Sequence, residues 1–200
     1  PKKETPKETP KEAPVWTESE ELKAATEKFH KGLGKNTLEL KKAKSDLQAL
    51  VDKTLKEGKD ALVKALEAES KNLLRQRKIS EAEKCTVFVS KHKTGRADWK
   101  NIPSAAVKRK YDLLVKKIGY LLKNGERKIG YKQKAVDNFI KRGQKPVLVA
   151  FDKEIDKAVK ANDLKAAKVI ETKKNEFKEL IASHASLSLE VKLAKTGIVF

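Results

Sequence analysis

The apolar residues of this 200-residue chain recur at the spacing of an α-helix, which constrains the fold more than any other feature. The clearest run has steps of four, three, four and three: Val107, Tyr111, Leu114, Ile118 and Leu121. Side chains spaced in this way lie on one face of a helix. Only Thr86–Val89 and the C-terminal tail have any strand character. We therefore predict an all-α fold.

The composition favours narrow helix–helix cores over a thick core built around a sheet. Charged residues make up 38% of the chain, well above the usual share of about 25%. Hydrophobic residues also make up 38%, which is below the usual level of about 45–50%. We expect an elongated bundle of about six to seven helices with helical hairpins.

Residues 1–16 are predicted to form an extended Pro/Lys-rich arm. Three tetrapeptides follow one another there, Lys-Glu-Thr-Pro twice and then Lys-Glu-Ala-Pro. A proline at every fourth position prevents a helix and favours an extended backbone, so this segment is expected to act as a tether.

Residues 17–185 are predicted to form one helical domain, followed by a C-terminal tail at 186–200. A first helix is expected from about residue 18 until Gly32 and Gly34 stop it. A long helix at about 37–77 follows, in which Gly58 marks a kink or a break.

Basic helices are expected over about 80–142. One begins at Ser80, another is opened by Pro103 or Ser104 and ended by Asn124-Gly125, and a third ends at Arg142-Gly143. An antiparallel hairpin at about 146–185 would begin at Pro146 and turn at Asn162-Asp163, with Asp163 as an N-cap.

The positive charge is concentrated in the middle of the chain. Residues 71–145 hold 22 Lys and Arg against 6 Asp and Glu, a net charge of +16. Residues 1–70 carry only +1 and residues 146–200 only +2, and all six arginines fall in the middle segment. Such a segment repels itself unless a negatively charged partner offsets the charge, whereas the alternative is a solvated surface that keeps the protein soluble.

We predict that this segment binds a polyanion. Lysine outnumbers arginine by 41 to 6, which favours contacts to a phosphate backbone over bidentate reading of bases. The candidate residues are Arg75, Arg77, Lys78, Lys91, Lys93, Arg96, Lys100, Lys108, Arg109, Lys110, Lys116, Lys117, Arg127, Lys128, Lys132, Lys134, Lys141 and Arg142.

Several aromatic residues lie among or near these charges. Tyr111 belongs to an apolar stripe and is expected in the core. Trp99 lies in a basic loop and is expected to be exposed, where it would stack on a base or enter a pocket of a partner protein. Trp16 is a second candidate for docking a partner.

No pattern of residues indicates catalysis, so we expect no enzyme activity, no cofactor and no small-molecule substrate. His30, His92 and His184 lack partners at metal-ligand spacing, and no phosphate-binding loop or nucleophile elbow occurs. Cys85 lies on the predicted apolar face of its helix, where a buried and inert thiol is expected.

These features predict a non-enzymatic structural protein that binds nucleic-acid backbone without sequence preference inside a larger particle. The alternative is an assembly or scaffold subunit of a virion shell, cytoskeletal lattice or organellar complex, docked on acidic protein surfaces. A single cysteine, no signal sequence and no membrane-spanning run suggest an intracellular reducing compartment: cytoplasm, nucleus, organelle matrix or virion.

Overall fold

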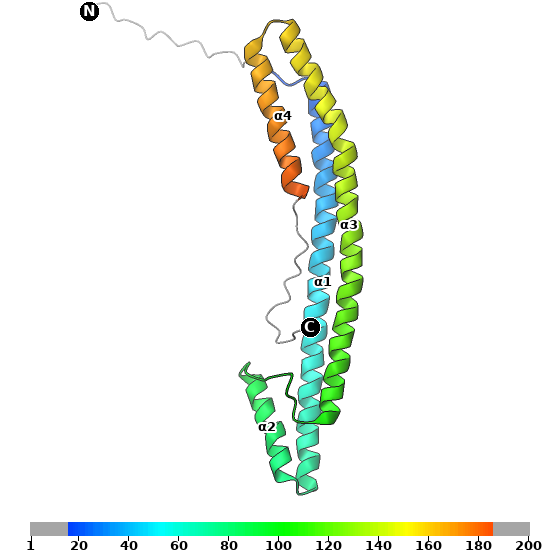
Figure 1. Ribbon diagram of the computed structural model, residues 1–200, viewed down its shortest axis with the longest axis vertical. Coiled ribbons are helices and arrows are strands. Elements are labelled where there is room, and N and C mark those ends of the chain that lie inside the picture. The colour runs from blue at the N-terminus through cyan, green and yellow to red at the C-terminus, as the bar shows by residue number, and fades with distance from the viewer. Residues whose placement is uncertain (1–15, 186–200) are drawn as a thin grey trace, which may run out of the picture. The chain divides into compact units, whose positions relative to one another are not determined.

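The computed structural model describes residues 16–185, which contain four α-helices and no strand. The helices are α1 (Glu20–Arg75), α2 (Ile79–Lys93), α3 (Ala105–Lys160) and α4 (Leu164–Ala185), as labelled in Figure 1. The all-α prediction is confirmed, and the prediction of six to seven helices is wrong. The expected N-terminal arm and C-terminal tail lie outside the described residues, apart from Trp16.

The described residues divide into two compact units, and both α1 and α3 contribute to each of them. Unit 1 contains residues 16–38 and 134–185, and unit 2 contains residues 39–133. Unit 1 therefore combines the start of α1, the end of α3 and α4. Unit 2 combines the rest of α1, α2 and the first half of α3.

The core of unit 2 follows an 11-residue repeat. Val107, Ile118 and Ile129 of α3 are buried, and so are Leu40, Val51, Leu62 and Leu73 of α1. Three turns of an α-helix take about 10.8 residues, so positions eleven apart point almost the same way. Each helix keeps one apolar stripe turned towards its neighbour.

In unit 2, large side chains of one long helix pack against glycines of the other, which runs antiparallel to it. Leu114 of α3 packs on Gly58 of α1, and Leu47 of α1 packs on Gly125 of α3. A Cβ atom built on Gly125 would lie 2.8 Å from Leu47 Cγ, which is closer than two non-bonded carbon atoms approach each other. These glycines therefore permit close packing of the two helices.

The core of unit 1 is an aromatic cluster that joins its three helices. Phe29 of α1 lies with its ring centroid 5.6 Å from that of Phe139 and 5.0 Å from that of Phe177. Phe151 of α3 lies 6.1 Å from Phe177 of α4. After the turn at residues 161–163, α4 runs antiparallel to the end of α3, and Asp163 caps it by accepting a hydrogen bond from Ala166 N at 2.9 Å.

The predicted helix ends at glycines are wrong, because these glycines lie inside the two long helices. Gly32 and Gly34 lie inside α1, and Gly125 and Gly143 lie inside α3. Phe139 packs on Gly32 and Phe29 packs on Gly143, so the missing side chains make room for aromatic rings. Likewise, α1 continues through Gly58 without a break.

Pro146 also lies inside α3, where the sequence predicted the start of a new helix. A proline removes one backbone hydrogen bond and costs about 3 kcal/mol in a helix interior. Pro146 is exposed, whereas Val147, Ala150 and Phe151 beside it are buried. Burial of these three side chains in the core of unit 1 offsets the lost hydrogen bond and keeps the helix continuous.

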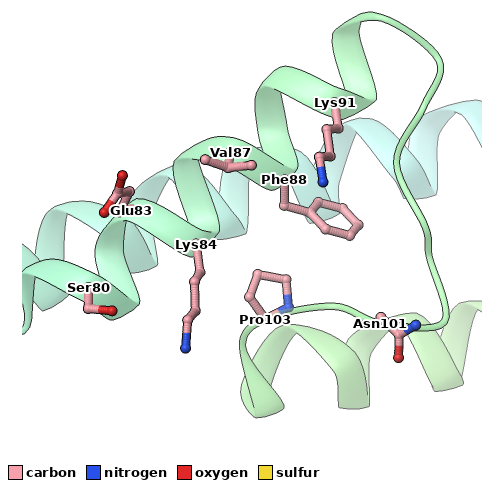
Figure 2. Close-up of a pocket in the computed structure, with 8 residues that line it drawn as sticks. All are labelled: Ser80, Glu83, Lys84, Val87, Phe88, Lys91, Asn101 and Pro103. Atoms are coloured by element: carbon pink, nitrogen blue, oxygen red, sulfur yellow. The ribbon is translucent and has the colours of Figure 1, made fainter.

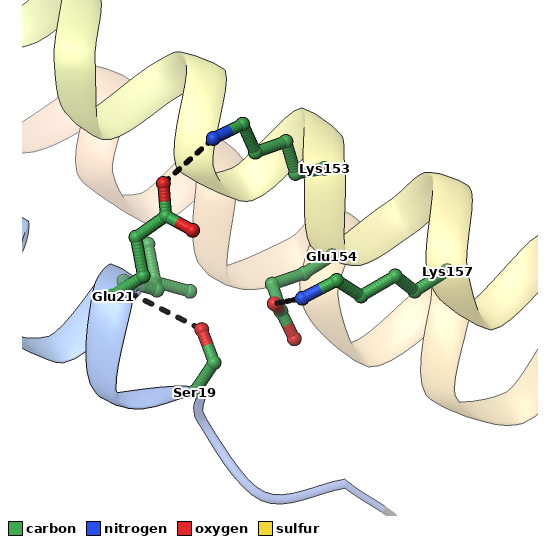
Figure 3. Close-up of polar contacts among 6 residues, drawn as sticks. Ser19, Glu21, Lys153, Glu154 and Lys157 are labelled. Carbon is green, nitrogen blue, oxygen red and sulfur yellow. Dashed lines mark hydrogen bonds and ion pairs between the residues drawn. The ribbon is translucent and has the colours of Figure 1, made fainter.

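The start of α1 is held by polar contacts with α3 in unit 1 (Figure 3). Ser19 caps α1 by accepting a hydrogen bond from Leu22 N at 3.3 Å, and Glu21 pairs with Lys153 at 2.7 Å. Glu154 is buried and pairs with Lys157 at 2.9 Å. Hydrogen bonds from Lys157, and also from Ser19 and Trp16, lower the pKa of the Glu154 carboxyl.

Candidate polyanion-binding surface

All eighteen basic residues that the sequence singles out are exposed. Lys134, Lys141 and Arg142 belong to unit 1, and the other fifteen belong to unit 2. We call these fifteen residues the basic surface of unit 2. They lie at the end of α1, in the turn at 76–78, on α2, on the loop at 94–104 and on α3.

The basic residues of α3 in unit 2 follow the same 11-residue period as its core. Lys116 and Arg127 are eleven residues apart, and so are Lys117 and Lys128. All four are exposed, whereas Ile118 and Ile129 are each only 1% exposed. The charges therefore form two rows along the helix: Lys116 and Arg127 lie opposite the buried isoleucines, and Lys117 and Lys128 lie beside the core, about 100° around the helix from it.

Carboxylates leave most of this charge uncompensated. Among residues 16–185, Lys132 is the one member of the eighteen that forms an ion pair, with Glu39 at 2.7 Å. Residues 39–70 of unit 2 hold seven basic and seven acidic residues, whereas residues 71–133 hold eighteen basic and five acidic ones. The excess charge therefore belongs to α2, the loop and α3, together with the last residues of α1 and the turn at 76–78.

A groove of about 520 Å³ lies between α2 and the loop within the basic surface (Figure 2). Lys84 and Lys91 of α2 extend along it towards the loop, and Phe88 and Pro103 form its apolar wall. Sequence reasoning missed Lys84 because Glu81 and Glu83 beside it suggest a balanced surface. Its seven-residue spacing from Lys91, which puts both on one helix face, was the available signal.

Trp99 is buried, which contradicts the expectation that this ring is exposed. It is 4% exposed and stacks on Tyr111 with centroids 5.9 Å apart. The rings of Phe88 and His92 of α2 pack edge-on against the Trp99 ring, with ring centroids 5.4 and 5.2 Å from its centroid. Its ring lies in the core because the loop folds back between α2 and α3, so Trp99 anchors the loop and offers no surface to a partner.

Lys59 of α1 packs against this aromatic cluster. Its Nζ lies 5.4 Å from the centroid of the Trp99 ring, where a cation is attracted to the ring face. Burial lowers the pKa of the Lys59 ammonium group. The Tyr111 ring is buried, as predicted. The second tryptophan, Trp16, is half-buried in unit 1 beside Glu154.

A five-residue motif occurs twice on α3 and was missed in the sequence. Lys-Lys-Ile-Gly-Tyr at 116–120 and Arg-Lys-Ile-Gly-Tyr at 127–131 differ at one position. In each copy the isoleucine is buried, whereas Tyr120 is 68% exposed and Tyr131 is 66% exposed. The signal was a repeat of eleven residues, shorter than the periods of repeat proteins.

Groups that could support metal or thiol chemistry are sparse in the part of the chain that the structure describes. No three His, Cys, Asp or Glu side chains within it are close enough to hold a metal ion. Cys85 is buried, as predicted, and burial together with Glu69 and Glu81 raises the pKa of its thiol. No described helix is long and apolar enough to span a membrane.

Comparison with known proteins identifies no relative. No family model matches the chain, and no curated protein or solved structure matches it significantly.

Proposed function

We propose that this protein is a non-enzymatic helical protein whose basic surface binds the backbone of a nucleic acid without reading its sequence, as part of a larger particle. One observation carries the proposal. Among the described residues, no cation of the basic surface forms an ion pair with a carboxylate, Lys132 excepted. Uncompensated charge of this density favours binding of a polyanion.

The kind of side chain supports phosphate contacts rather than base contacts. Twelve of the eighteen candidates are lysines, whose flexible ammonium groups bind phosphates as point charges. Such contacts position a protein on a nucleic acid without selecting a sequence. The regular rows on α3, with members eleven residues and about 16 Å apart, suit a ligand whose charges also repeat along a line.

Salt dependence tests the proposal. Affinity for a labelled duplex of mixed sequence would be measured by fluorescence anisotropy between about 50 and 200 mM salt, where phosphate contacts weaken steeply. The triple variant Lys116→Gln, Lys117→Gln, Arg127→Gln removes three cations from α3. Because each phosphate contact adds about 0.9 to the slope of log affinity against log salt, the slope should become shallower by about 2.7.

A matched control comes from the charge-balanced part of unit 2. The variant Lys41→Gln, Lys42→Gln, Lys64→Gln also removes three exposed cations, but from α1. Its affinity and salt slope should stay near those of the unaltered protein. Equal losses in both variants would mean that net charge acts without a defined surface. Absence of duplex and single-strand binding at low salt would overturn the proposal and favour an acidic protein surface as the partner.

A further inference from the structure

We propose that the two copies of the repeated motif on α3 form a stacking platform that makes the protein prefer single-stranded nucleic acid to duplex. This inference rests on the proposed function and goes beyond it by naming the form of the ligand. The platform consists of Tyr120 and Tyr131 with the two basic residues that precede each ring: Lys116, Lys117, Arg127 and Lys128.

The two rings point away from the core of unit 2. Each tyrosine follows a buried isoleucine by two residues, which is a rotation of about 200° around the helix. Within the described residues, Tyr120 and Tyr131 are the large aromatic side chains that are exposed. Burial in this fold therefore accounts for the isoleucines and leaves the tyrosines without a packing role.

Each ring has cations within reach on the same side of the helix. The basic residues stand three and four positions before the tyrosine in both copies, and residues at these separations are neighbours on a helix surface. A base stacked on the ring would thus bring its phosphate close to two cations. The same arrangement returns three turns later, about 16 Å along the helix.

The glycines of the motif also lack a packing reason. A Cβ atom built on Gly119 or Gly130 would meet nothing within 4 Å, in contrast to Gly58 and Gly125. A glycine inside a helix costs about 1 kcal/mol relative to alanine. Bare helix backbone beside each ring leaves room for a ligand to approach closely, which is one established use of glycine.

A single strand is the occupant that fits both the charges and the rings. Bases of a single strand have free faces that stack on aromatic side chains, whereas bases in a duplex are already stacked on each other. An acidic protein surface would pair with the cations but would need no exposed ring. Charge complementarity and the two free rings together favour a single strand.

The experiment compares Tyr120→Ala and Tyr131→Ala with Tyr120→Phe and Tyr131→Phe in the full chain. Binding to a labelled strand of thymidines, and to the same strand paired with its complement, is measured at one salt concentration. Each alanine substitution should weaken single-strand binding by about 5- to 150-fold, the usual range for one stacked base. Duplex binding should stay unchanged, and the phenylalanine variants should bind like the unaltered protein.

Leu113→Ala is the control, because Leu113 is 64% exposed on α3 and has no ring. Its single-strand affinity should not change. If the unaltered protein binds but the alanine variants lose nothing, or lose equal affinity for both ligands, the stacking platform is wrong while backbone binding stands. If the unaltered protein binds neither ligand, the proposed function itself fails.

Discussion

Alanine at Gly125 and alanine at Gly130 should change the stability of unit 2 in different directions. Both positions lie inside α3, where replacing glycine by alanine gains up to about 1 kcal/mol of helix propensity. At Gly130 a new methyl group meets nothing within 4 Å, so the whole gain of about 0.5–1 kcal/mol should appear.

At Gly125 the new methyl group collides with the side chain of Leu47. The added carbon would lie 2.8 Å from Leu47 Cγ, so the two helices must separate or Leu47 must leave its rotamer. Overpacking of this kind costs about 1–3 kcal/mol. After the gain in propensity is subtracted, Gly125→Ala should destabilise the protein by up to about 2 kcal/mol.

Urea unfolding followed by circular dichroism at the helix band measures both effects. The two variants should differ by about 1–3 kcal/mol in free energy of unfolding, with an unchanged dependence on urea. Gly58→Ala, which places a carbon 3.0 Å from Leu114 Cγ, should behave like Gly125→Ala. Equal stabilisation by Gly125→Ala and Gly130→Ala would show that α1 and α3 do not pack closely at these glycines.

Three further predictions concern buried groups. Trp99→Ala should cost about 3–5 kcal/mol of unfolding free energy, because its ring fills the core between α2 and α3; a loss below 1 kcal/mol in urea unfolding would place the ring at the surface. Because its pKa is lowered by folding, Glu154 should stabilise unit 1 above the usual glutamate pKa of about 4.3 and lose that contribution as pH falls through the folded pKa. Glu154→Gln should therefore cost about 1–3 kcal/mol at neutral pH and flatten the acid limb of stability against pH, and an unaltered acid limb would contradict this assignment. The Cys85 thiol should react with a thiol reagent far more slowly in the folded protein than in urea, and equal rates would contradict its burial.

Much of the candidate surface was predictable because charge segregation is a property of the chain itself. All eighteen basic residues predicted to face a partner are exposed, since a lysine or arginine on a helix seldom has a better place than water. Lys84 and the repeated motif were missed for another reason. The first stands among acidic neighbours, and the second was hidden by its period of eleven residues.

The apolar spacing alone determined that the described part of the chain is helical, because a stripe that repeats with the helical turn can be buried only as a helix. The number of helices depended on tertiary packing. Gly32, Gly125 and Gly143 look like helix stops in the sequence, yet each faces a large side chain of the opposite helix. Whether a glycine ends a helix or admits a neighbour is decided by what packs on it, and that partner is many residues away in the chain. The position of Trp99 was decided in the same way, by α2 and α3 closing around its loop.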